Sequence, residues 1–163
     1  MTEKVKALLS ESKAARWVAL ALISSTMFFA YFFVDVASPI KNQFEVNYHW
    51  SSEVFGIYGG MEFFFNVFFG FLIISGIILD KMGIRFTLIT SGLTMVLGAA
   101  IKFYALSMVN VESVTSILGY TLPTTAFLAC LGFAVFGVGV EMAGITVSKT
   151  IVKWFRGKEL ALA

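Results

Sequence analysis

The chain has 163 residues, of which 58% are hydrophobic and 13% are charged, and its formal net charge at pH 7 is +2. Soluble globular domains carry about 25% charged residues. A soluble core of this size could not bury all 18 Phe side chains. The composition therefore excludes an ordinary soluble domain and predicts an all-α, polytopic bundle of transmembrane helices.

The first segments of the chain predict a polar N-terminal region followed by a membrane span. Residues 1–16 are polar and of mixed charge, and we expect a cytoplasmic segment there that can form a short helix at the membrane surface. They are no signal peptide, because the apolar run behind them is too long and lacks a small-residue cleavage pattern. The first span is predicted at 17–38, since a helix needs ~20 residues to cross ~30 Å of hydrocarbon. Trp17 is placed as an interfacial anchor, and Pro39 ends the helix.

Three further apolar segments complete the predicted bundle, which covers residues 17–163. These spans are expected at 53–79, 86–107 and 124–152. The stretch Ser51-Ser52-Glu53 offers an N-cap with an acidic first turn for the second span. The segments before the second and fourth spans, 41–52 and 109–121, read as polar connections.

Basic residues are distributed unevenly between the two sides that four spans define. One side has only Lys41 and Lys102, and we interpret Lys102 as a side chain that reaches from a helix end to the interface. The other side collects Lys4, Lys6, Lys13, Arg16, Lys81, Arg85, Lys149, Lys153, Arg156 and Lys158. The positive-inside rule then predicts that both termini are cytoplasmic.

Polar residues inside the spans carry the functional signal, because each is costly in hydrocarbon. Helical spacing places them on one face of each helix, where they should face a bundle interior or a water-filled cavity. The three faces are Ser24, Tyr31 and Asp35; Gly59, Glu62, Asn66 and Gly70; and Gly137, Glu141, Gly144 and Ser148. The candidate solute or ion pathway consists of Tyr31, Asp35, Glu62, Asn66 and Glu141.

An alternative interpretation of these carboxyl groups stays open. Each could be protonated, or paired with one neighbour, and only hold helices together. For Glu141 in mid-span the pathway interpretation is favoured. For Asp35 and Glu62 the two interpretations are balanced, because solvated helix ends are common near the membrane boundary.

Motifs for other kinds of function are missing from the sequence. It has no Gly-rich phosphate loop, no Ser-His-Asp set and no metal-ligand spacing, and it contains a single His and a single Cys. We therefore expect no enzymatic activity, no cofactor and no metal site. Because the basic residues gather at a membrane face, we also expect no nucleic-acid partner.

A short charged connection joins the second and third spans and carries a recognisable pattern. Gly76, Asp80, Lys81, Gly83 and Arg85 resemble the loop motif between spans two and three of the major facilitator superfamily. Here Gly83 allows a sharp turn. The pattern departs from the motif at the residue after Gly83, where Ile stands in place of the basic residue of many members.

Other stretches extend this resemblance to residues 16–163. Residues 153–163 resemble the segment that leads into the fifth span of the superfamily. Within the superfamily, the chain looks closest to the group around major facilitator superfamily domain-containing protein 1. Residues 31–35 resemble the end of that group's first span, and residues 136–141 resemble the middle of its fourth.

The resemblance implies the first third of a transporter with two six-helix halves. Such a protein moves a small solute by secondary active or facilitative transport, through alternating access. Its partners would be the lipid bilayer, a small-molecule solute, a proton or another cation, and the remaining helices. The loop-motif Asp80 would act against a helix of the other half. The expected location is the cell (inner) membrane.

A second interpretation is a self-contained four-span membrane protein. It would act as an oligomeric small carrier or as a non-transporting membrane subunit. Whether the reading frame continues past Ala163 separates the two.

Overall fold

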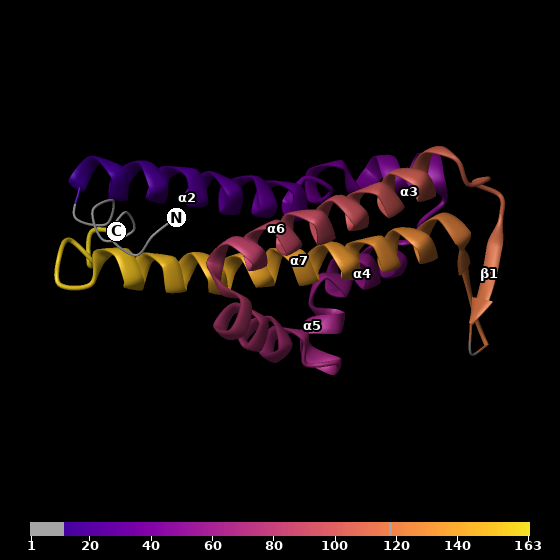
Figure 1. Ribbon diagram of the computed structural model, residues 1–163. Helices are drawn as coiled ribbons and strands as arrows, with labels where there is room; N and C mark the ends of the chain where they lie inside the picture. The colour runs from indigo at the N-terminus through magenta and orange to yellow at the C-terminus, as the bar shows by residue number, and fades with distance from the viewer. Residues whose placement is uncertain (1–11, 118) are drawn as a thin grey trace.

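Helices make up most of the chain in a computed structural model that describes residues 12–117 and 119–163 (Figure 1). Most of the predicted N-terminal segment lies outside these described residues. The elements in chain order are α2 (Lys13–Asp35), η1 (Ser38–Ile40), α3 (Lys41–Tyr48), α4 (Ser52–Gly60), η2 (Met61–Phe63), α5 (Phe64–Phe68), α6 (Phe71–Ser107), β1 (Val114–Ile117), β2 (Tyr120–Pro123) and α7 (Thr124–Phe155).

Three helical segments have the length and composition to cross a membrane. They are Lys13–Tyr48, Phe71–Ser107 and Thr124–Phe155. The structure thus supports the prediction of a helical membrane protein. It does not confirm the predicted four spans, because residues 12–117 and 119–163 hold no fourth helix of this kind.

Helix α7 forms the centre of the molecule, and the other long helices cover it. Ala126, Ala129, Ala134, Val140 and Ala143 of this helix are completely buried. By contrast, α2 and α6 expose large apolar side chains, and we assign this surface to the lipid. It includes Leu22, Phe29, Leu93, Val96 and Phe103.

Helices α6 and α7 pack closely because glycines line their contact. A Cβ atom at Gly98 would lie 2.6 Å from the carbonyl oxygen of Gly132, and one at Gly139 would lie 2.7 Å from that of Ser91. Such distances leave no room for a side chain, and small residues of this kind allow membrane helices to approach each other closely. We call this contact the glycine seam.

The predicted second span, 53–79, is broken in the structure, and the prediction of one continuous helix is wrong. Its residues form α4, η2, α5 and the first part of α6. The sharpest break is at Gly70, whose φ of 65° is a left-handed conformation that glycine adopts without a steric penalty. In Figure 1, α5 and the first part of α6 project to one side of the long helices, below α7.

The connection predicted around residues 80–85 is a single-residue turn. Helical conformation continues to Met82, and only Gly83 departs from it, with φ 83° and ψ 171°. Helix α6 therefore consists of two helices that meet at Gly83 and point in different directions (Figure 1). The predicted role of Gly83 as the turn residue is confirmed.

The opposite end of the bundle differs from the predicted polar connections. Residues 41–48 form α3, and residues 114–123 form an antiparallel hairpin in which Val114 pairs with Pro123. The Trp50 indole is buried and donates a hydrogen bond of 3.0 Å to the Thr125 hydroxyl. The predicted cap is confirmed, because the Ser51 hydroxyl accepts a hydrogen bond of 3.2 Å from the Val54 amide.

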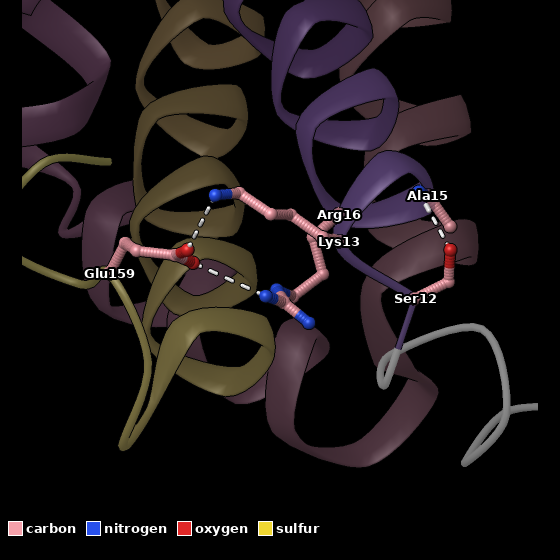
Figure 2. A network of polar contacts seen from close by, with 5 residues as sticks. All are labelled: Ser12, Lys13, Ala15, Arg16 and Glu159. Atoms are coloured by element: carbon pink, nitrogen blue, oxygen red, sulfur yellow. Dashed lines mark hydrogen bonds and ion pairs between the residues drawn. The ribbon is translucent and has the colours of Figure 1, made fainter.

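Charged side chains tie the start of α2 to the segment that follows α7 (Figure 2). The Glu159 carboxylate accepts from Arg16 at 3.2 Å and pairs with Lys13 at 3.3 Å. Trp17 packs edge-on against Phe155, with ring centroids 5.5 Å apart. The ends of α2 and α7 are thereby held together at this end of the bundle.

We expect Glu159→Gln to produce a small decrease in the melting temperature at pH 7. A backbone hydrogen bond, and then hydrogen bonds from Arg16 and Lys13, hold the pKa of Glu159 below its ordinary value of 4.5. A lowered pKa stabilises the fold above the unfolded-state pKa, and this contribution is lost as the pH falls through the folded-state value.

Thermal melting of purified protein in detergent, followed from pH 7 downward, measures this effect. The difference between the two proteins should shrink as the pH falls below 4.5 and vanish once it has passed the folded-state pKa of Glu159, which lies below that value. Glu112→Gln, at an exposed site before β1, is the matched control and should melt as the wild type does. A constant difference at every pH would contradict the assignment to this carboxylate.

Candidate functional site

The candidate site lies where α2, η2 and α7 meet, and Gly137 allows η2 to pack directly on α7. The backbone of Glu62 in η2 packs directly on Gly137 of α7, and a Cβ atom at Gly137 would overlap the Glu62 carbonyl group. This contact carries the Glu62 side chain into the bundle. With Asp35 and Glu141 it forms what we call the acidic site.

Glu62 and Asn66 are buried, as the predicted helical face requires. Their exposed fractions are 4% and 7%. The Asn66 amide donates to the Glu62 carbonyl oxygen at 3.4 Å. However, Glu62 Oε1 and Asn66 Oδ1 have no hydrogen-bond partner among the described residues. A buried polar atom without a partner is costly, and its presence points to a site that something else occupies.

A small cavity of about 110 Å³ adjoins this carboxylate. Asp35 and Ser38 line it from the end of α2 and the turn that follows, and Glu62 lines it from η2. Tyr58 and Phe133 supply an aromatic wall, with stacked rings whose centroids are 4.7 Å apart. The cavity thus combines two carboxylates, a hydroxyl group and aromatic faces.

A larger open groove runs along α2 on the other side of Asp35. Its volume is about 820 Å³, and Ser24, Tyr31 and Asp35 line it together with apolar residues of the same helix. The Tyr31 side chain is 45% exposed and lines this groove, so this face of α2 does not lie inside the described bundle. Because Asp35 lines both spaces, the groove and the small cavity share one carboxylate.

Glu141 lies half-buried in the middle of α7 and completes the acidic site. Glu141 acts electrostatically on both Tyr31 and Glu62, and Asp35 acts on Glu62 as well. The structure therefore brings the pathway residues Tyr31, Asp35, Glu62 and Glu141 into one neighbourhood. Asn66 lies one helical turn beyond Glu62.

Lys102 is the site residue that the sequence interpretation missed. Its ammonium group points into the bundle, 4.5 Å from the ring centroid of Phe133, 5.0 Å from that of Phe136 and 5.8 Å from that of Tyr58. It also acts electrostatically on Glu62. The interpretation of Lys102 as a side chain that reaches the interface is therefore wrong.

A sequence signal for this placement does exist. Lys102 follows Gly98 by four residues, so both lie on one face of α6. This is the face of the glycine seam, and a Cβ atom at Gly132 would lie 2.9 Å from Lys102 Cγ. A basic residue on a helix face that packs through glycine points toward the neighbouring helix.

The motif residues lie at the end of the bundle where α7 finishes. Gly76 and Lys81 are helical, Gly83 is the turn, and Arg85 begins the next turn of α6. Asp80 forms an ion pair with Lys149 of α7. Where the resemblance implies a partner in another half of a transporter, this structure supplies one within the same bundle.

We expect Asp80→Asn to lower the stability slightly. Asp80→Lys combined with Lys149→Asp reverses both charges of the ion pair and should restore the wild-type stability. The two side chains are 71% and 44% exposed, and exposed pairs of this kind contribute about 0.2–1 kcal/mol. A double-mutant cycle on the melting temperature measures the coupling. Additive effects of the single changes would contradict a direct interaction between the two side chains.

Comparison of the chain with protein-family models, with curated proteins and with solved structures finds no match in any of the three. Among residues 12–117 and 119–163, no group of three or more His, Cys, Asp and Glu side chains could hold a metal ion. The chemistry of the acidic site is therefore that of carboxylates, which bind a proton, an amine or a cation.

Proposed function

We propose that the chain belongs to a transporter of the major facilitator type, which moves a small solute across a membrane by alternating access. One observation carries this proposal. Glu62 is almost fully buried between helices of membrane-spanning character, and one of its carboxylate oxygens has no partner in the described chain. Ionisable residues at such positions are expensive in a membrane and typically mark solute or ion pathways.

The groove along α2 supports the proposal that the transported cargo is a small solute. Its volume of about 820 Å³ falls within the ~300–1,000 Å³ that is usual for small-molecule sites. Its aromatic and apolar lining, with Tyr31 and Asp35 as polar groups, also resembles such sites. In the proposed transporter, further helices cover the open side of this groove.

The packing supports a division into a rigid part and a mobile part. Helices α6 and α7 are locked by backbone contacts across the glycine seam. Helix α2 meets the middle of α7 through side chains, for example Met27 Cε at 3.6 Å from a Cβ atom placed on Gly144. In the proposed mechanism, α2 rocks against the α6–α7 pair around the acidic site, as expected for alternating access.

Uptake into proteoliposomes tests this function. The full protein is reconstituted and screened with small labelled solutes that carry an amino, a carboxyl or no charged group. Counterflow, which requires a carrier but no driving ion, detects exchange of any accepted solute. If no solute exchanges with correctly inserted protein, the transporter proposal is wrong.

Reporter fusions test the topology that the proposal requires. Reporters active only in the cytoplasm, fused to residues 1 and 163, should both be active. This outcome follows from the excess of Lys and Arg at the end of the bundle that holds Arg16 and Lys149. An inactive reporter at either terminus would contradict the proposed orientation.

The exposed groove on α2 favours one alternative, a self-contained membrane protein that associates with copies of itself. In that case a second copy would cover Tyr31 and Asp35. Cysteine crosslinking at Phe28 in native membranes separates the two. A crosslinked dimer of a chain that ends at Ala163 supports the alternative.

A further inference from the structure

The small cavity beside Glu62 is separate from the groove along α2, although Asp35 lines both spaces. We propose that the cavity between Asp35 and Glu62 binds a small monovalent inorganic cation, with Na⁺ as the best fit. The inference rests on the proposed transporter function, in which this ion is the coupling ion.

The need for a cation arises from Glu62. Its side chain is 4% exposed and lines the cavity, while its Oε1 atom has no partner among the described residues. The described residues also place no Lys, Arg or His nitrogen within ion-pair distance of it. A buried carboxylate in this state is strongly unfavourable unless it gains a proton or a cation.

The size of the cavity selects a small ion over an organic solute. A volume of about 110 Å³ is well below the ~300 Å³ of the smallest usual ligand pockets. A water molecule takes ~30 Å³ in the liquid. The cavity therefore has room for an ion with a few waters, which complete its coordination shell.

The ligand set favours a monovalent ion over a divalent one. The Asp35 and Glu62 carboxylates and the Ser38 hydroxyl are oxygen ligands, which hard cations prefer. Ca²⁺ takes 6–8 oxygen ligands and Mg²⁺ requires near-ideal octahedral geometry. Glu141, the third carboxylate of the acidic site, does not line this cavity, and no group of three or more His, Cys, Asp and Glu side chains among the described residues could hold a metal ion together.

Lys102 explains why the cavity is free for a mobile ion. The rings of Phe133 and Phe136 hold its ammonium group at 4.5 and 5.0 Å, by cation–π contact. The charged groups that act on Glu62 are thus Asp35, Glu141 and this tethered cation. Three carboxylates against one ammonium leave an excess of negative charge, which attracts a further cation.

Binding of Na⁺ to the purified full chain in detergent tests the proposal. The readouts are the melting temperature and equilibrium binding of ²²Na⁺, with N-methylglucamine chloride replacing NaCl so that ionic strength stays constant. We expect saturable binding and stabilisation by Na⁺. Glu62→Gln should raise the half-saturating concentration by about tenfold or more.

Lys102→Met should change the half-saturating Na⁺ concentration in the direction opposite to Glu62→Gln. Removing the tethered positive charge should lower the half-saturating Na⁺ concentration severalfold, because the ion no longer meets this repulsion. Glu53→Gln, at an exposed position in the first turn of α4, is the matched control and should bind as the wild type does. If Glu62→Gln fails to fold, Asp35→Asn on the exposed side of the cavity takes its place.

The outcomes separate this inference from the proposed function. An unchanged response to Na⁺ in Glu62→Gln, or none in the wild type, overturns the cation site, and Glu62 is then neutralised by a proton. Stronger binding of Ca²⁺ than of Na⁺ also overturns it. Na⁺ binding without solute exchange supports the cation site and contradicts the proposed transport function. Solute exchange without Na⁺ binding supports the transport function and contradicts the cation site.

Discussion

Gly137→Val is expected to destabilise the protein more than any other single change at the acidic site. A side chain at this position of α7 would overlap the Glu62 backbone, and no rotation of the valine can relieve that contact. Overpacking of a core usually costs about 1–3 kcal/mol, and we expect a cost at or above the upper end because backbone must move.

Thermal melting in detergent and the yield of monodisperse protein measure this effect. The matched control is Gly144→Ala, seven residues along the same helix. A Cβ atom there meets only the flexible end of Met27, at 3.6 Å. The alanine variant should melt close to the wild type. Equal melting temperatures for Gly137→Val and the wild type would show that η2 does not pack on α7 as described.

Glu141→Gln is expected to abolish transport while leaving the fold intact. The substitution keeps size and hydrogen bonding but removes the negative charge and the titration. Glu141 is half-buried in the middle of α7 and acts electrostatically on Glu62 and Tyr31. Loss of this charge changes the field at both the groove and the small cavity, and we expect transport to fall by at least about tenfold.

Solute exchange in proteoliposomes measures the effect, at several pH values and with insertion checked by protease protection. Glu53→Gln again serves as control, since it removes a carboxylate outside the acidic site. Wild-type exchange with a wild-type pH profile in the Glu141→Gln protein would make Glu141 structural. The polar face of the fourth predicted span would then serve helix packing alone.

Local patterns predicted several features that the structure confirms. Ser51 caps α4, and Gly83 makes the turn, because each depends on the chemistry of one or two residues. The spacing of Glu62 and Asn66 predicted a shared buried face, which local helical geometry is sufficient to produce. α7 was predicted at 124–152 and is observed as Thr124–Phe155, because a long apolar run leaves few alternatives.

The features that sequence patterns missed depend on contacts between distant segments. The second predicted span breaks at Gly70, which adopts a left-handed conformation. Glycine also occurs inside many helices, so its presence alone does not predict a break. The exposed position of Tyr31 depends on which helices cover α2. The position of Gly98 on the same helix face indicates that Lys102 points toward α7, but the aromatic rings that receive its ammonium group belong to the distant segments α4 and α7.

The central place of α7 has a consequence for the order in which the protein can mature. Ribosomes deliver residues 124–155 after all the other described helices, yet α2, α4, η2, α5 and α6 all pack on this helix. Until α7 emerges, Glu62 and Asn66 have no buried position to occupy. During synthesis the polar groups of the earlier segments therefore stay unburied, in the membrane or the insertion machinery, until α7 is inserted. In that interval quality-control proteases have access to them.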